Sequence, residues 1–253
     1  ISFIPEDDAL VDLFFPGREY ITDLYYHGTH VAATVASNGL VAAGVTSKTT
    51  LMGVKVCSVY ENIACPGEAI VQGILYAVDN GADVINMSLG GAFFKKDYPG
   101  YVSLVNTLIN YAKRNGVTIV VSAGNAAQDL DHTSNLFSTY CDASNVVCVS
   151  ATGPAESDDE RVGPWYEVDT PAIYTNYGRS AINVAAPGGN YYITDEEEVE
   201  IGGWVYAACS QTSLVIPDCQ TGIYIVGLIG TSMAAPHVSG TAALIVEDVG
   251  RNP

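Results

Sequence analysis

The stretch that decides the fold runs Gly230-Thr231-Ser232-Met233-Ala234-Ala235-Pro236-His237-Val238-Ser239-Gly240. Glycine lets the backbone turn sharply, so Ser232 is expected at the start of a helix with its hydroxyl exposed. The free N–H groups of a first helical turn point toward incoming negative charge. Pro236 is expected within that first turn, where no intrahelical N–H bond would be lost. The stretch therefore predicts a nucleophilic serine beside an anion-stabilising helix start.

Two further segments carry side chains suited to acyl transfer. His27-Gly28-Thr29-His30-Val31-Ala32 places a histidine just before a predicted helix, and a neutral imidazole is the best group to accept a hydroxyl proton near pH 7. Ser122-Ala123-Gly124-Asn125 directly follows an apolar strand, where an amide can donate into a cleft. Taken alone, a histidine there is more often structural and Gly-Asn is an ordinary turn.

The rest of the chain alternates predicted strands and helices. Continuous apolar runs are typical of strands covered on both faces; they are 51–56, 83–87, 117–122, 146–150 and 181–185. Helical patterns cover 29–37, 69–80 and 102–115, and the last two are followed by Gly81 and Gly116, suited to a left-handed closing residue. We therefore expect an α/β fold of three layers, with a mostly parallel central sheet and helices on both faces.

Together, the three motifs in this order resemble the subtilisin-like serine proteases (subtilases, peptidase S8). The segments Val84–Gly91, Tyr174–Gly178 and Val184–Gly188 are also similar to that family. The resemblance covers about residues 27–247. The α/β-hydrolase elbow is disfavoured, because it needs glycine two residues after the serine and Ala234 stands there.

The resemblance implies a role for each motif. His27 would be the general base, with His30 a structural neighbour, and Ser232 the nucleophile. Asn125 and the Ser232 N–H would stabilise the oxyanion. Protein or peptide substrates would bind to the segments Ser88-Leu89-Gly90 and Ser122-Ala123-Gly124, and extended substrate would pair with the edge near Cys65–Gly67.

One member of the family's triad is not apparent. The family has an aspartate at the end of an early strand, closely followed by glycine, and Asp7, Asp8 and Asp12 do not fit that pattern. Asp23 is too near His27 to come from a separate strand. We expect the first strand and its aspartate upstream of Ile1, and the closing helices beyond residue 253.

Residues 1–253 are accordingly interpreted as one subtilisin-like domain, truncated at both ends. The region 188–228 is predicted to be a disulfide-held, β-rich insertion beside the site, with an acidic run at 195–198. The piece alone is expected to be unstable and nearly inactive.

Charge and cysteines bear on partners and compartment. Twenty-eight acidic against ten basic residues give a formal charge of −18, which disfavours nucleic acid and anionic lipid as partners. No run of apolar residues is long enough for a membrane span, so a soluble monomer is expected. Sequence proximity pairs the six cysteines as Cys57–Cys65, Cys141–Cys148 and Cys209–Cys219, although about fifteen connectivities exist. Three disulfides indicate secretion, and buried free thiols are the alternative.

No cofactor or metal is expected for catalysis. The histidines His27, His30, His132 and His237 form no ligand cluster by spacing, and the serine motif explains His27 better than half a zinc site does. Family members often bind structural Ca²⁺, but the loop 37–44 carries no carboxylate, so a calcium site there is not expected and any other stays unassigned.

Other functions remain open at this stage. An inactive subtilisin fold serving as a binding module, or an esterase or peptide ligase with the same acyl-enzyme chemistry, would share these motifs. The glycine- and alanine-rich pocket segments suit broad specificity with an apolar preference. The polar stretch 129–134 could instead favour a basic side chain.

Overall fold

The computed structural model describes residues 1–39, 42–60, 63–193 and 197–251. The elements that build the centre of the molecule are α2 (His27–Val35), α3 (Gly67–Asp79), β1 (Val84–Met87), α4 (Pro99–Arg114), β3 (Thr118–Ser122), β5 (Val146–Gly153), β8 (Thr170–Pro171), β9 (Val184–Pro187) and α6 (Thr231–Val249). Within the described ranges no helix is long and apolar enough to cross a membrane.

The central sheet has the order β1-β3-β5-β8, and β9 also pairs with β5. The pairs β1–β3, β3–β5 and β5–β9 are parallel, whereas β8 is antiparallel to β5. The predicted strands at 83–87, 117–122, 146–150 and 181–185 are confirmed with shifts of a few residues at the ends. Ser122 thus lies at the predicted end of its strand, whereas the last strand begins at Val184, three residues later than predicted.

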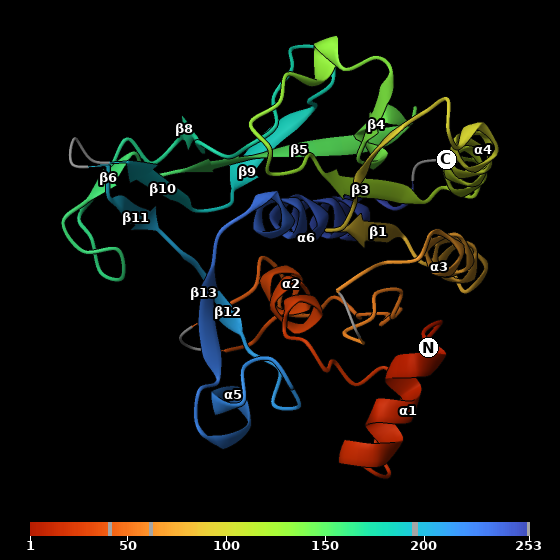
Figure 1. Ribbon diagram of the computed structural model, residues 1–253, viewed down its shortest axis with the longest axis horizontal. Coiled ribbons are helices and arrows are strands. Elements are labelled where there is room, and N and C mark those ends of the chain that lie inside the picture. The colour runs from red at the N-terminus through yellow and green to blue at the C-terminus, as the bar shows by residue number, and fades with distance from the viewer. Residues whose placement is uncertain (40–41, 61–62, 194–196, 252–253) are drawn as a thin grey trace.

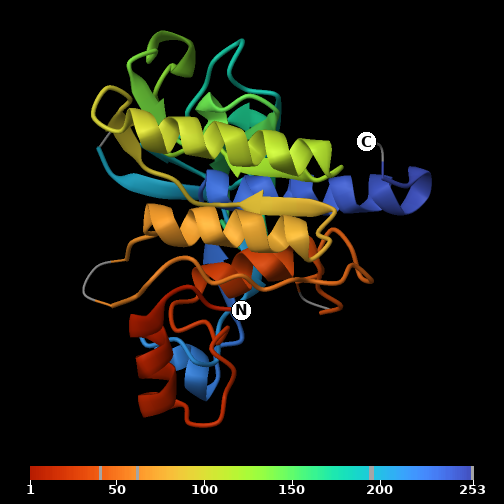
Figure 2. The ribbon, with the colours of Figure 1, turned by 90° about the vertical axis from the view of Figure 1, so that its right-hand side faces the viewer.

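Helices cover both faces of the sheet, as expected (Figure 1). Ile119 and Val121 point into a core with α3 and α4, while Val120 between them points into a second core with Ala234 and Ala235 of α6. This alternation follows from the two-residue period of a strand. Figure 2 shows α3 and α4 lying along the molecule beside α6. The three-layer α/β architecture is confirmed.

The glycines predicted to close two helices do so. Gly81 after α3 and Gly116 after α4 have φ of +82° and +72°. Each donates its N–H back to the helix, Gly81 to the Val78 carbonyl and Gly116 to the Lys113 carbonyl, at 3.2 and 3.0 Å. These bonds satisfy carbonyls that the end of a helix would otherwise leave unpaired.

The predicted strand at 51–56 is wrong as a strand. Only Lys55 is paired there, in a parallel bridge with Ser2, and the rest of the segment has no regular secondary structure. A strand is stabilised by continuous pairing with a neighbour. Residues 1–3 supply such a neighbour for Lys55 alone.

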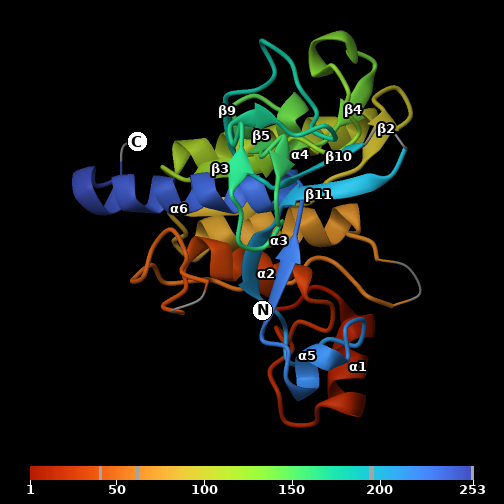
Figure 3. The same ribbon diagram turned by 90° about the vertical axis from the view of Figure 1, so that its left-hand side faces the viewer.

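The peripheral elements are short. They are α1 (Pro5–Phe14), β2 (Ala92–Phe94), η1 (Leu130–His132), β4 (Leu136–Ser138), η2 (Tyr140–Asp142), β6 (Glu156–Ser157), β7 (Trp165–Tyr166), β10 (Asn190–Ile193), β11 (Val199–Gly203), β12 (Val205–Ala208), α5 (Asp218–Thr221) and β13 (Ile225–Leu228). Figure 3 shows α1 and α5 together at the end of the molecule away from the sheet.

The region 188–228 is β-rich, as predicted. It forms two antiparallel hairpins, β10–β11 and β12–β13. Residues 195 and 196 of the predicted acidic run lie outside the described residues. The three predicted disulfides are all present, Cys57–Cys65, Cys141–Cys148 and Cys209–Cys219.

Candidate active site

Ser232 is the second residue of α6, the helix that lies against the centre of the sheet (Figure 1). Gly230 precedes the helix with φ of +149°, a backbone conformation that side chains rarely adopt. Its N–H donates to the carbonyl of Gly188 at 2.9 Å, which fixes the entry to the helix. The prediction of a serine at a helix start after a glycine turn is confirmed.

Pro236 lies inside α6, not in its first turn, so that part of the prediction is wrong. A proline has no N–H, so it leaves the carbonyl four residues earlier without its usual helical donor. That carbonyl belongs to Ser232, and it accepts the hydroxyl of Ser88 at 2.8 Å. The proline is tolerated because a side chain from the end of β1 replaces the lost bond.

Asn125 is joined to the same helix start. Its Oδ1 accepts the Thr231 N–H at 2.9 Å and the Thr231 hydroxyl at 2.8 Å. In turn, the Thr231 hydroxyl accepts the N–H of Gly124 at 3.0 Å. Because these two donors identify the oxygen of the amide, the Nδ2 group is its other end, available as a donor to an oxyanion near Ser232.

His27 begins α2, which packs against α6. The Val35 carbonyl at the end of α2 faces Gly240 of α6. His27 and Ser232 stand in the first turns of these two packed helices. Among the described residues, the Ser232 hydroxyl donates to the Ser88 carbonyl at 3.4 Å and not to His27.

The electrostatics of His27 suit a general base. Burial lowers the pKa of His27 below its ordinary value of 6.5, and the negative charge of Asp23 opposes that shift. A lowered pKa keeps the imidazole neutral and able to accept a proton at neutral pH. Asp23 itself caps α2, because its carboxylate accepts the N–H and the hydroxyl of Thr29 at 2.8 and 2.7 Å.

His30 is a buried structural residue, as expected. Burial lowers its pKa to about 4, so the ring is neutral. Its Nε2 lies 3.0 Å from the carbonyl of Val205, and because a carbonyl only accepts, Nε2 carries the proton. This bond connects α2 to β12.

The two predicted substrate segments lie on neighbouring strand ends. Ser88, Leu89 and Gly90 follow β1, and the segment Ser122-Ala123-Gly124 ends β3, the parallel partner of β1. Gly90 and Gly124 both face the side chain of Thr139, which a Cβ on either glycine would approach to 3.2 Å. The structure thus brings the two segments together around Thr139.

Sequence reasoning missed the positioning roles of Thr139 and Asn176. The Oδ1 of Asn176 accepts the N–H groups of Ala126 and Gln128 at 3.0 and 2.9 Å, and its Nδ2 donates to the Ala123 carbonyl at 2.8 Å. It therefore holds the loop that carries Asn125. The segment 174–178, which contains Asn176, is similar to the family and could have indicated this residue. Nothing in the sequence indicates Thr139.

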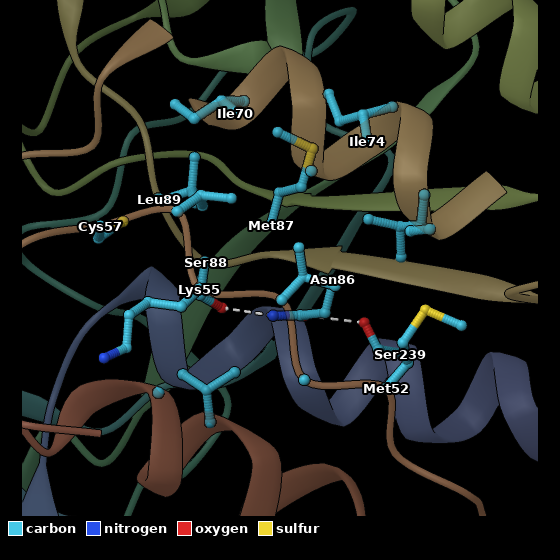
Figure 4. A pocket seen from close by; sticks show the side chains of 18 of the residues that line it. Met52, Lys55, Cys57, Ile70, Ile74, Asn86, Met87, Ser88, Leu89 and Ser239 are labelled. Carbon is cyan, nitrogen blue, oxygen red and sulfur yellow. Dashed lines mark hydrogen bonds between the residues drawn. The ribbon is translucent and has the colours of Figure 1, made fainter. Parts of the chain in front are cut away.

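A second network joins β1 to α6 (Figure 4). The Nδ2 of Asn86 donates to the Ser88 hydroxyl at 3.0 Å, and its Oδ1 accepts the Ser239 hydroxyl at 2.8 Å. Asn86 thus orients Ser88, which in turn binds the Ser232 carbonyl. Ser232 is connected to the sheet on one side by Asn125, through Thr231, and on the other by this chain of hydroxyl and amide groups.

A cavity of about 1630 Å³ opens beside β1. Its walls are the segment 48–57, the segment 82–92 with β1, α3, and parts of α2 and α6, and His27 and Ser88 border it. Ile70, Ile74 and Met87 contribute apolar side chains to it (Figure 4). Protein interiors hold few voids larger than a water molecule, so a space of this size in the centre of a fold is unusual.

No group of three or more His, Cys, Asp or Glu side chains suited to a metal ion occurs in the part of the chain that the structure describes. The loop 37–44, where no calcium site is expected, includes residues 40 and 41, which lie outside that part.

This arrangement of a serine at a helix start, a histidine at a packed helix start and an amide donor beside the serine is that of a serine peptidase. The chain belongs to the Subtilase family, whose model matches residues 16–251. It is 32% identical over 237 residues to Subtilisin DY of Bacillus licheniformis, covering 92% of this chain and 68% of that protein. It is 34% identical over 232 residues to the Major intracellular serine protease of Bacillus subtilis, covering 90% and 57%.

Solved structures agree with this assignment. A lanthipeptide protease superposes with a TM-score of 0.68 at 25% identity, over 91% of this chain and 65% of that one. A protease from Pseudoalteromonas arctica gives 0.61 at 32% identity, over 87% and 58%. The chain thus spans between 57% and 68% of the length of these four relatives.

Proposed function

We propose that the whole protein is a serine endopeptidase acting through an acyl-enzyme. The observation that supports this most is the pair of hydrogen bonds that the Oδ1 of Asn125 accepts from the N–H and the hydroxyl of Thr231, which sets the amide beside the nucleophile. Ser232 Oγ attacks the peptide carbonyl carbon while His27 takes its proton. The C–N bond then breaks, and the leaving amine takes that proton from His27. Water, activated by the same base, releases the acyl group.

The tetrahedral oxyanion would accept two hydrogen bonds. One comes from the Nδ2 of Asn125 and the other from the backbone N–H of Ser232, which as an early helical N–H has no intrahelical acceptor. Both donors are fixed before substrate arrives, so little reorganisation is needed when the charge develops.

We further propose that the cavity beside β1 is occupied by an extended segment that precedes Ile1 in the natural chain and carries the third triad residue, an aspartate. Residues 1–3 run parallel to the segment that ends at Lys55: Lys55 donates to the Ile1 carbonyl and Phe3 donates to the Lys55 carbonyl, at 3.0 and 2.9 Å. A chain entering Ile1 in the same direction would run along the segment 48–53, which is one wall of the cavity.

Such a segment would also give β1 a second neighbour. In the described part of the sheet β1 pairs with β3 alone. The upstream segment would also bury the apolar side chains of Ile70, Ile74 and Met87, which line the cavity, and burial of apolar surface favours folding. A carboxylate at the end of that strand would orient the imidazole of His27, which borders the cavity.

The preference we propose is broad, with an apolar bias in the pocket for the residue before the scissile bond. The support is that Gly90 and Gly124, which would form the walls of that pocket, have no side chains and both face Thr139. The alternative, a basic preference through Asp129, is weakened because that carboxylate already pairs with His132 at 2.8 Å. Matched peptide substrates with Phe, Leu or Lys at this position would decide between them.

We also propose that the protein is secreted and acts as a monomer. Three disulfides suit an oxidising compartment. Detection of the protein in the culture medium after fractionation of the natural host would test secretion. Size-exclusion chromatography of the purified protein would test the monomeric state.

Fluorophosphonate labelling of the natural full-length protein tests the activity, with Ser232→Ala and His27→Ala beside it. The probe reacts with a serine whose base and oxyanion donors are assembled. We expect labelling that disappears in both variants. A folded, fully processed protein that does not label would instead be a binding module on an inactive scaffold.

A further inference from the structure

The tip of the β12–β13 hairpin, residues 209–222, contacts the segment that leads to His27. The tip is closed on itself by the Cys209–Cys219 disulfide and by the Cys209 N–H, which donates to the Tyr224 carbonyl at 2.9 Å. The hairpin runs from the level of α2 to α5 (Figure 1). It therefore presents a preformed surface to the loop before α2.

Three hydrogen bonds join the tip to Asp23 and Leu24. The hydroxyls of Ser210 and Thr212 both donate to the Asp23 carbonyl, at 2.5 and 2.9 Å, and the Leu214 N–H donates to the Leu24 carbonyl at 2.8 Å. Ser210, Thr212 and Leu24 are all buried. Hydrogen bonds in such a dry position constrain a backbone more than exposed ones do.

The side chain of Asp23 passes this constraint to α2. Its Oδ2 accepts the Thr29 N–H and hydroxyl, and its Oδ1 accepts the Tyr25 N–H at 2.9 Å. His27 lies between those two acceptor contacts in the sequence. Two hydroxyls of the insertion thus bind the backbone carbonyl of Asp23. The side chain of the same residue caps α2, the helix that His27 begins.

The hairpin has a second attachment to the same helix. His30, one turn after His27, donates its Nε2–H to the Val205 carbonyl of β12. Residues of the insertion therefore hold α2 at its first turn from two directions.

We propose that Ser210 and Thr212 are positioning residues that act through Asp23 to fix the imidazole of His27, so that the 188–228 insertion is a clamp on the general base. The inference rests on the proposed peptidase function for its kinetic consequence, whereas its structural part does not.

The clamp is expected to control the pKa of His27, through the titratable groups that surround it. Asp23, from the loop before α2, is the group that raises the pKa of His27 against the effect of burial. His30 on α2 lies next to His27, and His237 on α6 lies near His30, while β12 contributes the Val205 carbonyl. Releasing the Asp23 carbonyl would let its carboxylate move away, and the pKa of His27 would then fall further.

The test uses the natural full-length protein with Thr212→Val, which keeps the side-chain shape and removes the donor, alone and with Ser210→Ala. Thr212→Ser restores the donor. Thr221→Val is the matched control, because Thr221 is an exposed threonine of the same tip whose hydroxyl bonds only within α5. The readouts are the His27 titration by NMR, also taken in a Ser232→Ala background, and kcat and KM on a short peptide substrate.

We expect the His27 pKa to move down in Thr212→Val, further in the double variant, and back in Thr212→Ser. We expect kcat to fall about tenfold in Thr212→Val with KM unchanged, and Thr221→Val to match wild type. If the double variant does not fold, the Thr212→Val and Thr212→Ser pair decides.

An unchanged His27 titration in Thr212→Val would overturn the clamp, as would an equal loss of kcat in Thr221→Val. A wild-type protein without turnover whose His27 titration still shifts would refute the peptidase function and leave the clamp intact.

Discussion

The hydroxyl of Ser88 donates to the backbone carbonyl of Ser232 at 2.8 Å, at the turn of α6 where Pro236 has no N–H to offer. A residue of the predicted pocket wall is therefore bonded directly to the peptide unit of the nucleophile. Under the proposed function, substrate bound against Ser88 and the attacking oxygen of Ser232 would be supported by the same hydrogen bond. Such a shared support favours the fixed geometry that efficient attack requires.

Replacing Ser88 with alanine should weaken both stability and catalysis. The half-buried Ser232 carbonyl would lose its hydrogen-bond donor, and an unsatisfied group of this kind costs about 1–3 kcal/mol. Urea unfolding and kcat measure the two effects. Ser103→Ala, at an exposed position of α4, is the control. Unchanged stability and kcat in Ser88→Ala would contradict the role.

Asn125→Ala should reduce kcat far more than KM, because its Nδ2 is a donor to charge that exists only in the transition state. The size expected, about 10²–10³ in kcat, is carried over from a subtilisin in which this kind of donor was removed. Steady-state kinetics on one peptide measure it. A loss confined to KM would instead assign Asn125 to ground-state binding.

The acid limb of the pH profile of kcat/KM should follow the pKa of His27, because the base must be neutral and activity is lost as pH falls through that pKa. Burial lowers the pKa of His27, whereas the negative charge of Asp23 raises it, and the aspartate proposed upstream of Ile1 would raise it as well. Asp23→Asn keeps an acceptor for Thr29 but removes the charge that raises the pKa of His27, so the limb should move to lower pH. A limb that moves to higher pH in Asp23→Asn would contradict this account.

Residues 1–253 produced alone should be unstable and nearly inactive if the cavity beside β1 is filled by an upstream strand. A version extended upstream by the natural sequence should melt cooperatively and label with fluorophosphonate. Thermal unfolding and labelling of both chains measure this. A cooperative melt with full turnover from residues 1–253 would contradict the proposal that another strand completes the core.

The site was more predictable than its supports. His27, Asn125 and Ser232 stand in motifs whose chemistry is local, so a helix start and a strand end sufficed to place them. The contacts between Ser210 and Asp23, or between Ser88 and Ser232, join residues far apart in the sequence and leave no periodic pattern. Thr139 was missed for the same reason: what matters is the two glycines facing it, which only the packed structure brings together.

The strand prediction at 51–56 failed for a related reason. The apolar run was identified correctly, but a ladder depends on a partner that the run itself cannot supply. Pro236 was misplaced because the sequence rule considers only the missing N–H of the proline. The tertiary donor that compensates for it, Ser88, comes from another strand.

The three disulfides close loops of only 7 to 10 residues. Cross-links over such short loops remove less conformational entropy from the unfolded chain than cross-links over long loops would, since the effect grows with loop length. Each joins residues already near in sequence, and none ties the segment 48–57 to β1 across the cavity between them. Each disulfide therefore constrains a local segment of the chain and not the arrangement of segments that are distant in sequence. The attachment of the segment 48–57 to β1 therefore depends on noncovalent contacts, including those of the strand proposed to fill the cavity, and not on a disulfide.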